Sequence, residues 1–200
     1  MLISSSHRFC FIHIPKTGGS SITAALAAFL DEPKVVRFGK GWSITHHALG
    51  GMHGHARSAP IPEGLRVWHC CRNPYTRAIS LWRTHHRHDE SFAAFVGRLL
   101  GQDRNTDRGG RVMLNRSRPQ YWWLNGELHR SASIRFEDLD REFSYFCSEQ
   151  DLPSIRLPHI NHRRGPFPPW QDLYTEPIRQ NVAEFYENDF STFSYPTEIS

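Results

Sequence analysis

The sequence has no run of about eighteen apolar residues, the length that a helix needs to cross a bilayer. We therefore expect a protein without a membrane span. Residues 1–14 also lack a basic leader and a small-residue cleavage site, so they do not resemble a secretion signal. From these two absences we expect the protein to be cytoplasmic.

Cysteine is sparse, and none of its positions has the CxxC spacing of a zinc or redox site. The four cysteines lie in apolar segments, which favours buried, reduced thiols over disulfides or a metal site. The histidine-rich stretch at residues 85–88 lacks the Cys or acidic ligands that would complete a zinc site. No metal is expected. The cysteines are Cys10, Cys70, Cys71 and Cys147.

Neither sign of charge dominates, since 24 Lys and Arg residues face 20 Asp and Glu residues, for a net charge of +4. This small excess favours anionic partners, but a nucleotide, an acidic glycan and a nucleic acid would fit equally well. The sequence shows no repeat and no low-complexity linker. Its length of 200 residues predicts one compact domain over residues 1–200.

Short apolar runs alternate with helix-forming segments along most of the chain. This alternation predicts an α/β fold, a three-layer sandwich with a central, mainly parallel sheet. Residues 39–64 have no clear periodicity, although a short helix around Ala48 stays open, and the polar residues 101–119 predict a mobile loop. The predicted strands are residues 8–14, 34–38, 66–71 and 131–136. The predicted helices are residues 20–30, 73–87, 90–100, 137–150 and 176–188.

The segment PKTGGSS, residues 15–21, follows a buried strand, turns through Gly18 and Gly19 and leads into a helix. Backbone N–H groups in such a turn converge on an anion at the positive end of the helix. Lys16 adds a mobile positive charge, and it precedes the glycines, unlike the lysine of the triphosphate loop GxxxxGK[ST]. The segment therefore predicts a site for a phosphate-like group, with a serine-capped glycine turn as the alternative. Its hydroxyl donors are Thr17, Ser20 and Ser21.

A second strand-to-helix junction carries the residues RNPYTRAIS at positions 72–80. Arg72 lies at the strand's end, and Arg77 and Ser80 are three residues apart on one helix face. Arginine and serine together can clamp a phosphate with forked N–H donors and a hydroxyl. Solvated or salt-bridged surface arginines are the alternative. Two anion sites after two strands of one sheet imply a ligand with two separated phosphates.

Together the two motifs resemble the 5′-phosphosulfate loop and the 3′-phosphate motif of sulfotransferases that use 3′-phosphoadenosine 5′-phosphosulfate (PAPS). The resemblance is to the carbohydrate branch, which is Golgi-type and acts on heparan- or chondroitin-like glycans, and to its small bacterial relatives. It continues through IRFEDLDREFSYF, LPHINHRR and YENDFSTFSYP. It implies a P-loop-like sulfotransferase fold, PAPS as sulfonate donor and adenosine 3′,5′-bisphosphate (PAP) as product.

The resemblance also implies a role for particular residues. Lys16 and the loop that follows it, Thr17, Gly18, Gly19, Ser20 and Ser21, would hold the transferring sulfonate and the 5′-phosphate. Arg72 and Ser80 would hold the 3′-phosphate.

Sulfonate transfer to a hydroxyl needs a group that takes the hydroxyl proton, and histidine suits this near neutral pH. The order of His53, Gly54 and His55 before the strand at residues 66–71 resembles that of uronyl 2-O-sulfotransferases. The resemblance implies His55 as the base, with His53 as a supporting residue or alternative base. The runners-up are His46 and His47.

The acceptor implied by the resemblance is a hydroxyl of a saccharide or glycan, with a lipid-linked or small-molecule hydroxyl left open. Arginines within residues 104–118 could bind its carboxylates or sulfates, and aromatic rings could stack on its sugars. Burial of Trp122 and Trp123 in a core is the alternative. The candidate aromatic residues are Tyr121, Trp122, Trp123 and Trp170.

Three other readings of the chain stay open at this point. A P-loop-type kinase would share the α/β architecture, but the sequence lacks its triphosphate loop. A nucleic-acid-binding module would explain the charge but would not need two phosphate sites, so no nucleic acid is expected as partner. A nucleotide-binding relative without catalysis would need an assay to be recognised. The oligomeric state is not predicted.

Overall fold

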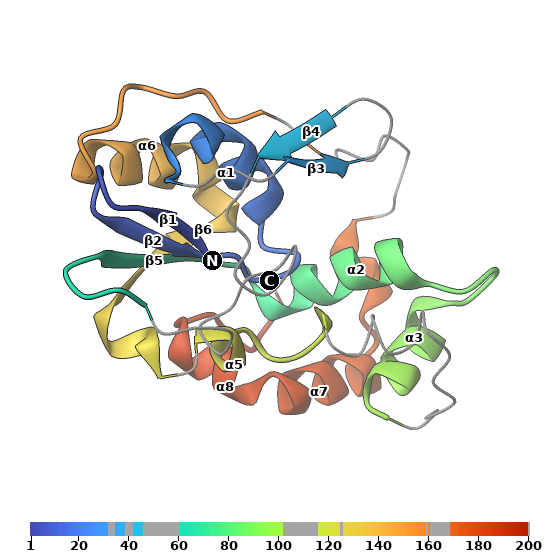
Figure 1. The fold of residues 1–200 in the computed structure, drawn as a ribbon. Helices are drawn as coiled ribbons and strands as arrows, with labels where there is room; N and C mark the ends of the chain where they lie inside the picture. The colour runs from blue at the N-terminus through green and yellow to red at the C-terminus, as the bar shows by residue number, and fades with distance from the viewer. Residues whose placement is uncertain are drawn as a thin grey trace. The chain divides into compact units, whose positions relative to one another are not determined.

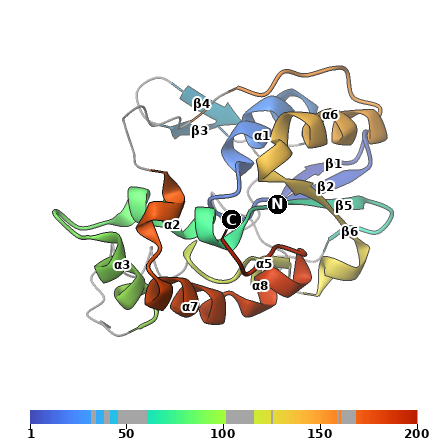
Figure 2. The same ribbon diagram turned by 180° about the vertical axis from the view of Figure 1, so that it is seen from behind.

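The computed structural model describes residues 1–31, 35–38, 42–45, 61–101, 116–124, 126–158, 160 and 169–199. The chain forms two compact units, each continuous in space but not in sequence. Figures 1 and 2 show the elements of both units from opposite sides. The first unit comprises Met1–Cys71 and Trp123–His162, and the second comprises Arg72–Trp122 and Arg163–Ser200.

A four-stranded sheet in the order β1-β2-β5-β6 is the centre of the first unit. Strands β2, β5 and β6 are parallel neighbours, whereas β1 pairs antiparallel with β2 at the edge. Every residue of β2 is buried, as expected for a parallel strand that reads as an unbroken apolar run. The strands are β1 Leu2–Ser4, β2 Phe9–Ile12, β5 Arg66–Cys71 and β6 Ser131–Arg135.

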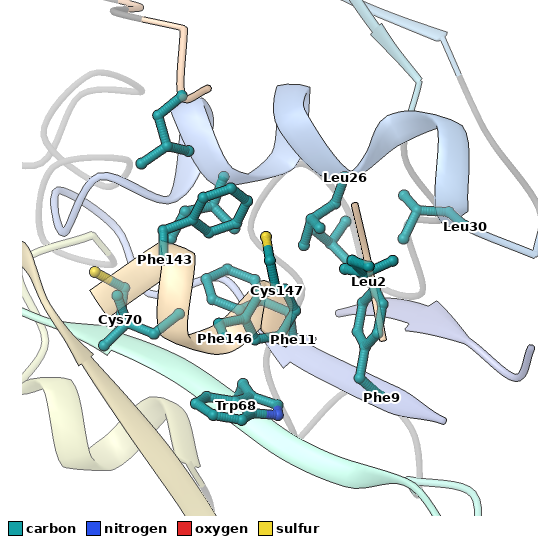
Figure 3. Packing of buried hydrophobic residues seen from close by; sticks show 14 residues of the cluster. Leu2, Phe9, Phe11, Leu26, Leu30, Trp68, Cys70, Phe143, Phe146 and Cys147 are labelled. Atoms are coloured by element: carbon teal, nitrogen blue, oxygen red, sulfur yellow. The ribbon is translucent and has the colours of Figure 1, made fainter. Parts of the chain in front are cut away.

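Helices α1, Gly19–Leu26, and α6, Leu139–Glu149, lie side by side over this sheet (Figure 1). Alternating residues of the strands point to these helices and form the core drawn in Figure 3. The ring of Phe146 meets the rings of Phe9 and Trp68 edge-on, with centroids 5.3 and 5.0 Å away. The 3₁₀ turns of this unit are η1 Ala27–Phe29, η2 Glu127–Arg130 and η3 Phe136–Asp138.

The first unit also contains a separate antiparallel pair, formed by β3, Val35–Phe38, and β4, Trp42–Thr45. The strand expected at residues 34–38 is therefore present. It pairs with β4, however, and is not part of the four-stranded sheet.

The described elements of the second unit are helices. At the start of α2, the Asn73 side chain accepts a hydrogen bond from the Tyr75 N–H at 2.9 Å, and Pro74 takes the first helical position. The Tyr174 ring packs edge-on against those of Tyr75 and Phe92, with centroids 5.0 and 5.1 Å away. The elements are α2 Pro74–His85, α3 Phe92–Leu99, η4 Trp170–Leu173, α7 Glu176–Phe185 and α8 Glu187–Thr192. Helix α5, Gln120–Leu124, begins in this unit and ends in the first.

The structure confirms the predicted α/β class and the mainly parallel sheet. Among the described strands and α-helices, β1, β4 and α5 were not predicted. Strand β1 and helix α5 are too short to show a period, and β4 lies in a segment rich in glycine and histidine. In place of the helix predicted at residues 176–188, the structure has two helices, α7 and α8, separated by Tyr186. Ala48 and residues 102–115 lie outside the described residues. The single domain over residues 1–200 stays a prediction.

The four cysteines are all buried and form no disulfide, as the sequence predicted. Within the described part of the chain, no helix is long and apolar enough to cross a membrane.

Candidate functional site

Residues 15–18 form a tight turn between β2 and α1. Lys16 and Gly18 both have left-handed backbone, with φ of 69° and 89°. This conformation costs a side-chain-bearing residue such as Lys16 about 1 kcal/mol, so the surrounding structure must hold it in place. The turn follows the carboxyl end of a parallel strand, the usual location of ligand sites in α/β proteins.

The start of α1 carries no side chain that would compete with an anion. Its N-cap is Gly18, no side chain caps it, and its first turn contains no acidic residue. The first amide groups of a helix have no partner within the helix and lie at its positive end. A phosphate or sulfate group would meet both needs.

Two rings leave no space beside the glycines of the loop. A Cβ on Gly19 would lie 2.2 Å from Cδ2 of His13, and one on Gly18 would lie 2.9 Å from Cδ2 of Phe136. His13 is buried, and its Nδ1 is 3.4 Å from Oγ1 of Thr23 on α1. His13 was not among the predicted site residues. It follows directly after β2, and alternation puts it on the same face as Phe11, the face toward α1.

The three predicted hydroxyl donors differ in their surroundings. The buried Thr17 hydroxyl donates to the Ile14 carbonyl at 2.9 Å and so braces the turn. The Ser21 hydroxyl oxygen accepts from the Ile160 N–H at 3.5 Å and keeps its proton for another partner. Ser20 is half-buried at the helix start. The backbone of Thr17 is also fixed, because the Cys70 thiol donates to its carbonyl.

The second motif begins with Arg72, the residue after β5. Its Nε donates to Thr76 Oγ1 at 3.0 Å, which orients the guanidinium. Its N–H donates to Gln120 Oε1 at 2.9 Å, and its carbonyl accepts from Gln120 Nε2 at 2.9 Å. Ser80 is half-buried on α2.

The sequence predicted that Arg77 and Ser80 would bind a phosphate together, but the structure gives Arg77 other partners. Its side chain is fully buried in the second unit, and its Nη2 donates to the carbonyls of Arg116 and Arg118 at 3.0 and 2.9 Å. Its Nη1 lies 3.9 Å from Oδ2 of the buried Asp189. The predicted clamp of Arg77 with Ser80 is therefore wrong, because Arg77 is occupied by internal partners.

The candidate bases His46, His47, His53 and His55 lie outside the described residues, so their roles stay predictions. His69 is buried in β5, with Nε2 3.1 Å from Ser133 Oγ. Burial lowers the pKa of His69 to about 4, so this residue is neutral near pH 7. We therefore assign His69 to the core. Among the described segments, no group of three or more His, Cys, Asp or Glu side chains could hold a metal ion.

The candidate aromatic residues differ in how deeply they are buried. Trp123 is only 1% exposed and belongs to a core. Trp122 is half-buried, with the Arg118 guanidinium 4.4 Å from its ring centroid. Trp170 packs edge-on against Tyr174 with a centroid distance of 6.1 Å. A cation over a partly open ring is thus found at Trp122.

Two comparisons with known proteins found a match. The model of the sulfotransferase family matches residues 1–196. The chain is also similar to a sulfotransferase from Alicyclobacillus acidocaldarius, with 15% identity and a TM-score of 0.36 in its crystal structure. That similarity covers 70% of this chain and 56% of the other, so the chain spans little more than half of that structure. No curated protein matches.

Proposed function

We propose that this chain, which belongs to the sulfotransferase family, transfers the sulfonate of PAPS to an acceptor hydroxyl and releases PAP. The observation that carries the proposal is the family match over residues 1–196, with the turn at residues 15–18 in front of α1. This helix start has neither a side-chain cap nor an acidic residue. Such a helix start suits the charge of a phosphosulfate.

In this proposal the donor's two ends have separate partners. Lys16 and the loop residues 17–21 bind the 5′-phosphate and the transferring sulfonate. Arg72 and Ser80 bind the 3′-phosphate. The bond from Arg72 Nε to Thr76 supports this role, because it fixes the plane of a guanidinium whose forked donors match a phosphate.

The proposed reaction is an in-line displacement at sulfur. The acceptor oxygen forms a bond to sulfur, the bond from sulfur to the 5′-phosphate oxygen breaks, and the acceptor proton passes to a base. We assign the base to His55, with His53 in support. Lys16 and the loop amides stabilise the negative charge that grows on the departing phosphate oxygen. Positioning and fixed dipoles supply most of the rate, as in phosphoryl transfer.

The proposed acceptor is a hydroxyl of a saccharide or glycan. The half-buried Trp122 supports this choice, since a sugar ring can stack on an aromatic face. Arg118 over the same ring offers a cation to a carboxylate or sulfate of the sugar.

Nucleotide binding tests the donor directly. PAP at about 100 times its dissociation constant should stabilise the folded protein by about 2.7 kcal/mol. The melting temperature should therefore rise by several degrees with PAP, and much less with ATP or ADP at the same concentration. Differential scanning fluorimetry measures all three. No shift at saturating PAP, or an equal shift with ATP, would contradict the proposal.

Replacement of the base tests the chemistry. We expect His55→Ala to lower the rate of sulfonate transfer by about 10² to 10⁴ and to leave the affinity for PAP unchanged. His88→Ala is the matched control, because His88 is exposed beside Asp89. Undiminished turnover in His55→Ala would remove this residue from the role. A wild type that binds PAP and transfers nothing to any hydroxyl acceptor would be a nucleotide-binding relative without catalysis.

A further inference from the structure

The backbone of Arg72 is held by a side chain from another part of the chain. Gln120 is completely buried, and its amide pairs with both backbone groups of Arg72, each at 2.9 Å. One planar amide therefore satisfies the N–H and the carbonyl of a single residue, much as a neighbouring strand would.

Gln120 is itself fixed by Asp189. The backbone N–H groups of Gln120 and Tyr121 donate to the two carboxylate oxygens of Asp189 at 2.7 and 3.0 Å. Asp189 is buried and paired with Arg77. The side chains of Gln120, Asp189 and Arg77 are all buried, and so Gln120 presents its amide to Arg72 in one orientation.

Arg72 is thus restrained at two points. Gln120 fixes its backbone, and Thr76 fixes its guanidinium through Nε. The forked donors of arginine recognise a phosphate only when both their position and their plane are right. Thr76 lies on the same helical segment as the motif, whereas Gln120 comes from outside it.

We propose that Gln120 is a positioning residue that sets the preference for a 3′-phosphorylated nucleotide by holding Arg72. This inference rests on the proposed function, in which Arg72 binds the 3′-phosphate. Gln120 itself does not touch the nucleotide. Its loss changes the discrimination between nucleotides with and without a 3′-phosphate, which a purely structural glutamine would leave intact.

The test compares the affinities of PAP and adenosine 5′-monophosphate by isothermal titration calorimetry. Gln120→Leu should raise the dissociation constant of PAP about tenfold, because Arg72 loses both backbone hydrogen bonds, and should leave that of the monophosphate nearly unchanged. Arg72→Ala should abolish the preference, and Gln120→Leu should add nothing in that background. Gln150→Leu is the matched control, since Gln150 is also buried but belongs to the first unit.

If Gln120→Leu does not fold, Gln120→Asn takes its place in the test. The shorter side chain of this variant keeps the amide but has less reach, so the variant should also lower the affinity for PAP and leave that for the monophosphate nearly unchanged. Equal loss of both nucleotides, an unchanged preference in the folded variants, or an additive effect with Arg72→Ala would overturn the role of Gln120. A wild type with no preference for PAP would instead contradict the proposed function, and the role of Gln120 with it.

Discussion

Alanine in place of Gly19 should lower the rate of sulfonate transfer about 100-fold, the size of effect expected when a reacting group is displaced by about 1 Å. The added Cβ would lie 2.2 Å from Cδ2 and 2.5 Å from Nε2 of His13. The His13 ring is buried and lies 3.4 Å from Thr23 Oγ1, so moving it aside would disturb its packing. The start of α1 would have to move, and with it the amides proposed to bind the phosphosulfate. A radiolabelled sulfonate-transfer assay measures the rate.

Two variants isolate the steric cause. Gly126→Ala is the control, because Gly126 has a positive φ of 87° but no atom within 4 Å of an added Cβ. The control should lose some stability through backbone strain and little transfer rate. The double variant His13→Ala, Gly19→Ala removes the clash and should recover part of the rate. Wild-type activity in Gly19→Ala, or a double variant no faster than the single, would contradict the account.

Methionine in place of Arg77 should lower the free energy of unfolding by about 3 to 5 kcal/mol. The buried carboxylate of Asp189 would lose its cation, and the carbonyls of Arg116 and Arg118 would lose their common donor. For a chain of this size the melting temperature should fall by about 10 °C. Circular dichroism on heating measures the change, with urea titration for the free energy.

The matched control for Arg77 is Arg141→Met. Arg141 is 73% exposed and pairs with Asp138 on the surface, so its loss should cost at most about 1 kcal/mol. The double variant Arg77→Met, Asp189→Asn removes the uncompensated charge and should be more stable than Arg77→Met alone. A melting temperature for Arg77→Met as high as that of the control would show that the buried pair does not stabilise the second unit.

Local pattern was enough to predict much of the fold. The apolar run at residues 66–71 matches β5 residue for residue, and Asn73 with Pro74 marked the start of α2. Both signals depend on neighbours in the chain, namely strand burial and the geometry of a first helical turn. Helix α5 gave no such signal, because its first two amides are held by Asp189, which lies 69 and 68 residues further along the chain.

By itself the sequence determined the alternation of strands and helices, and it predicted an anion site at residues 15–21. That prediction needs only neighbours in the chain, because it depends on a glycine turn between a strand and a helix start. Only the tertiary structure decided that Arg77 is an internal ion-pair partner, that His13 fills the space beside Gly19, and that Gln120 holds Arg72. These roles depend on which distant segments become neighbours, and that is set by packing, which leaves no periodic trace in the sequence.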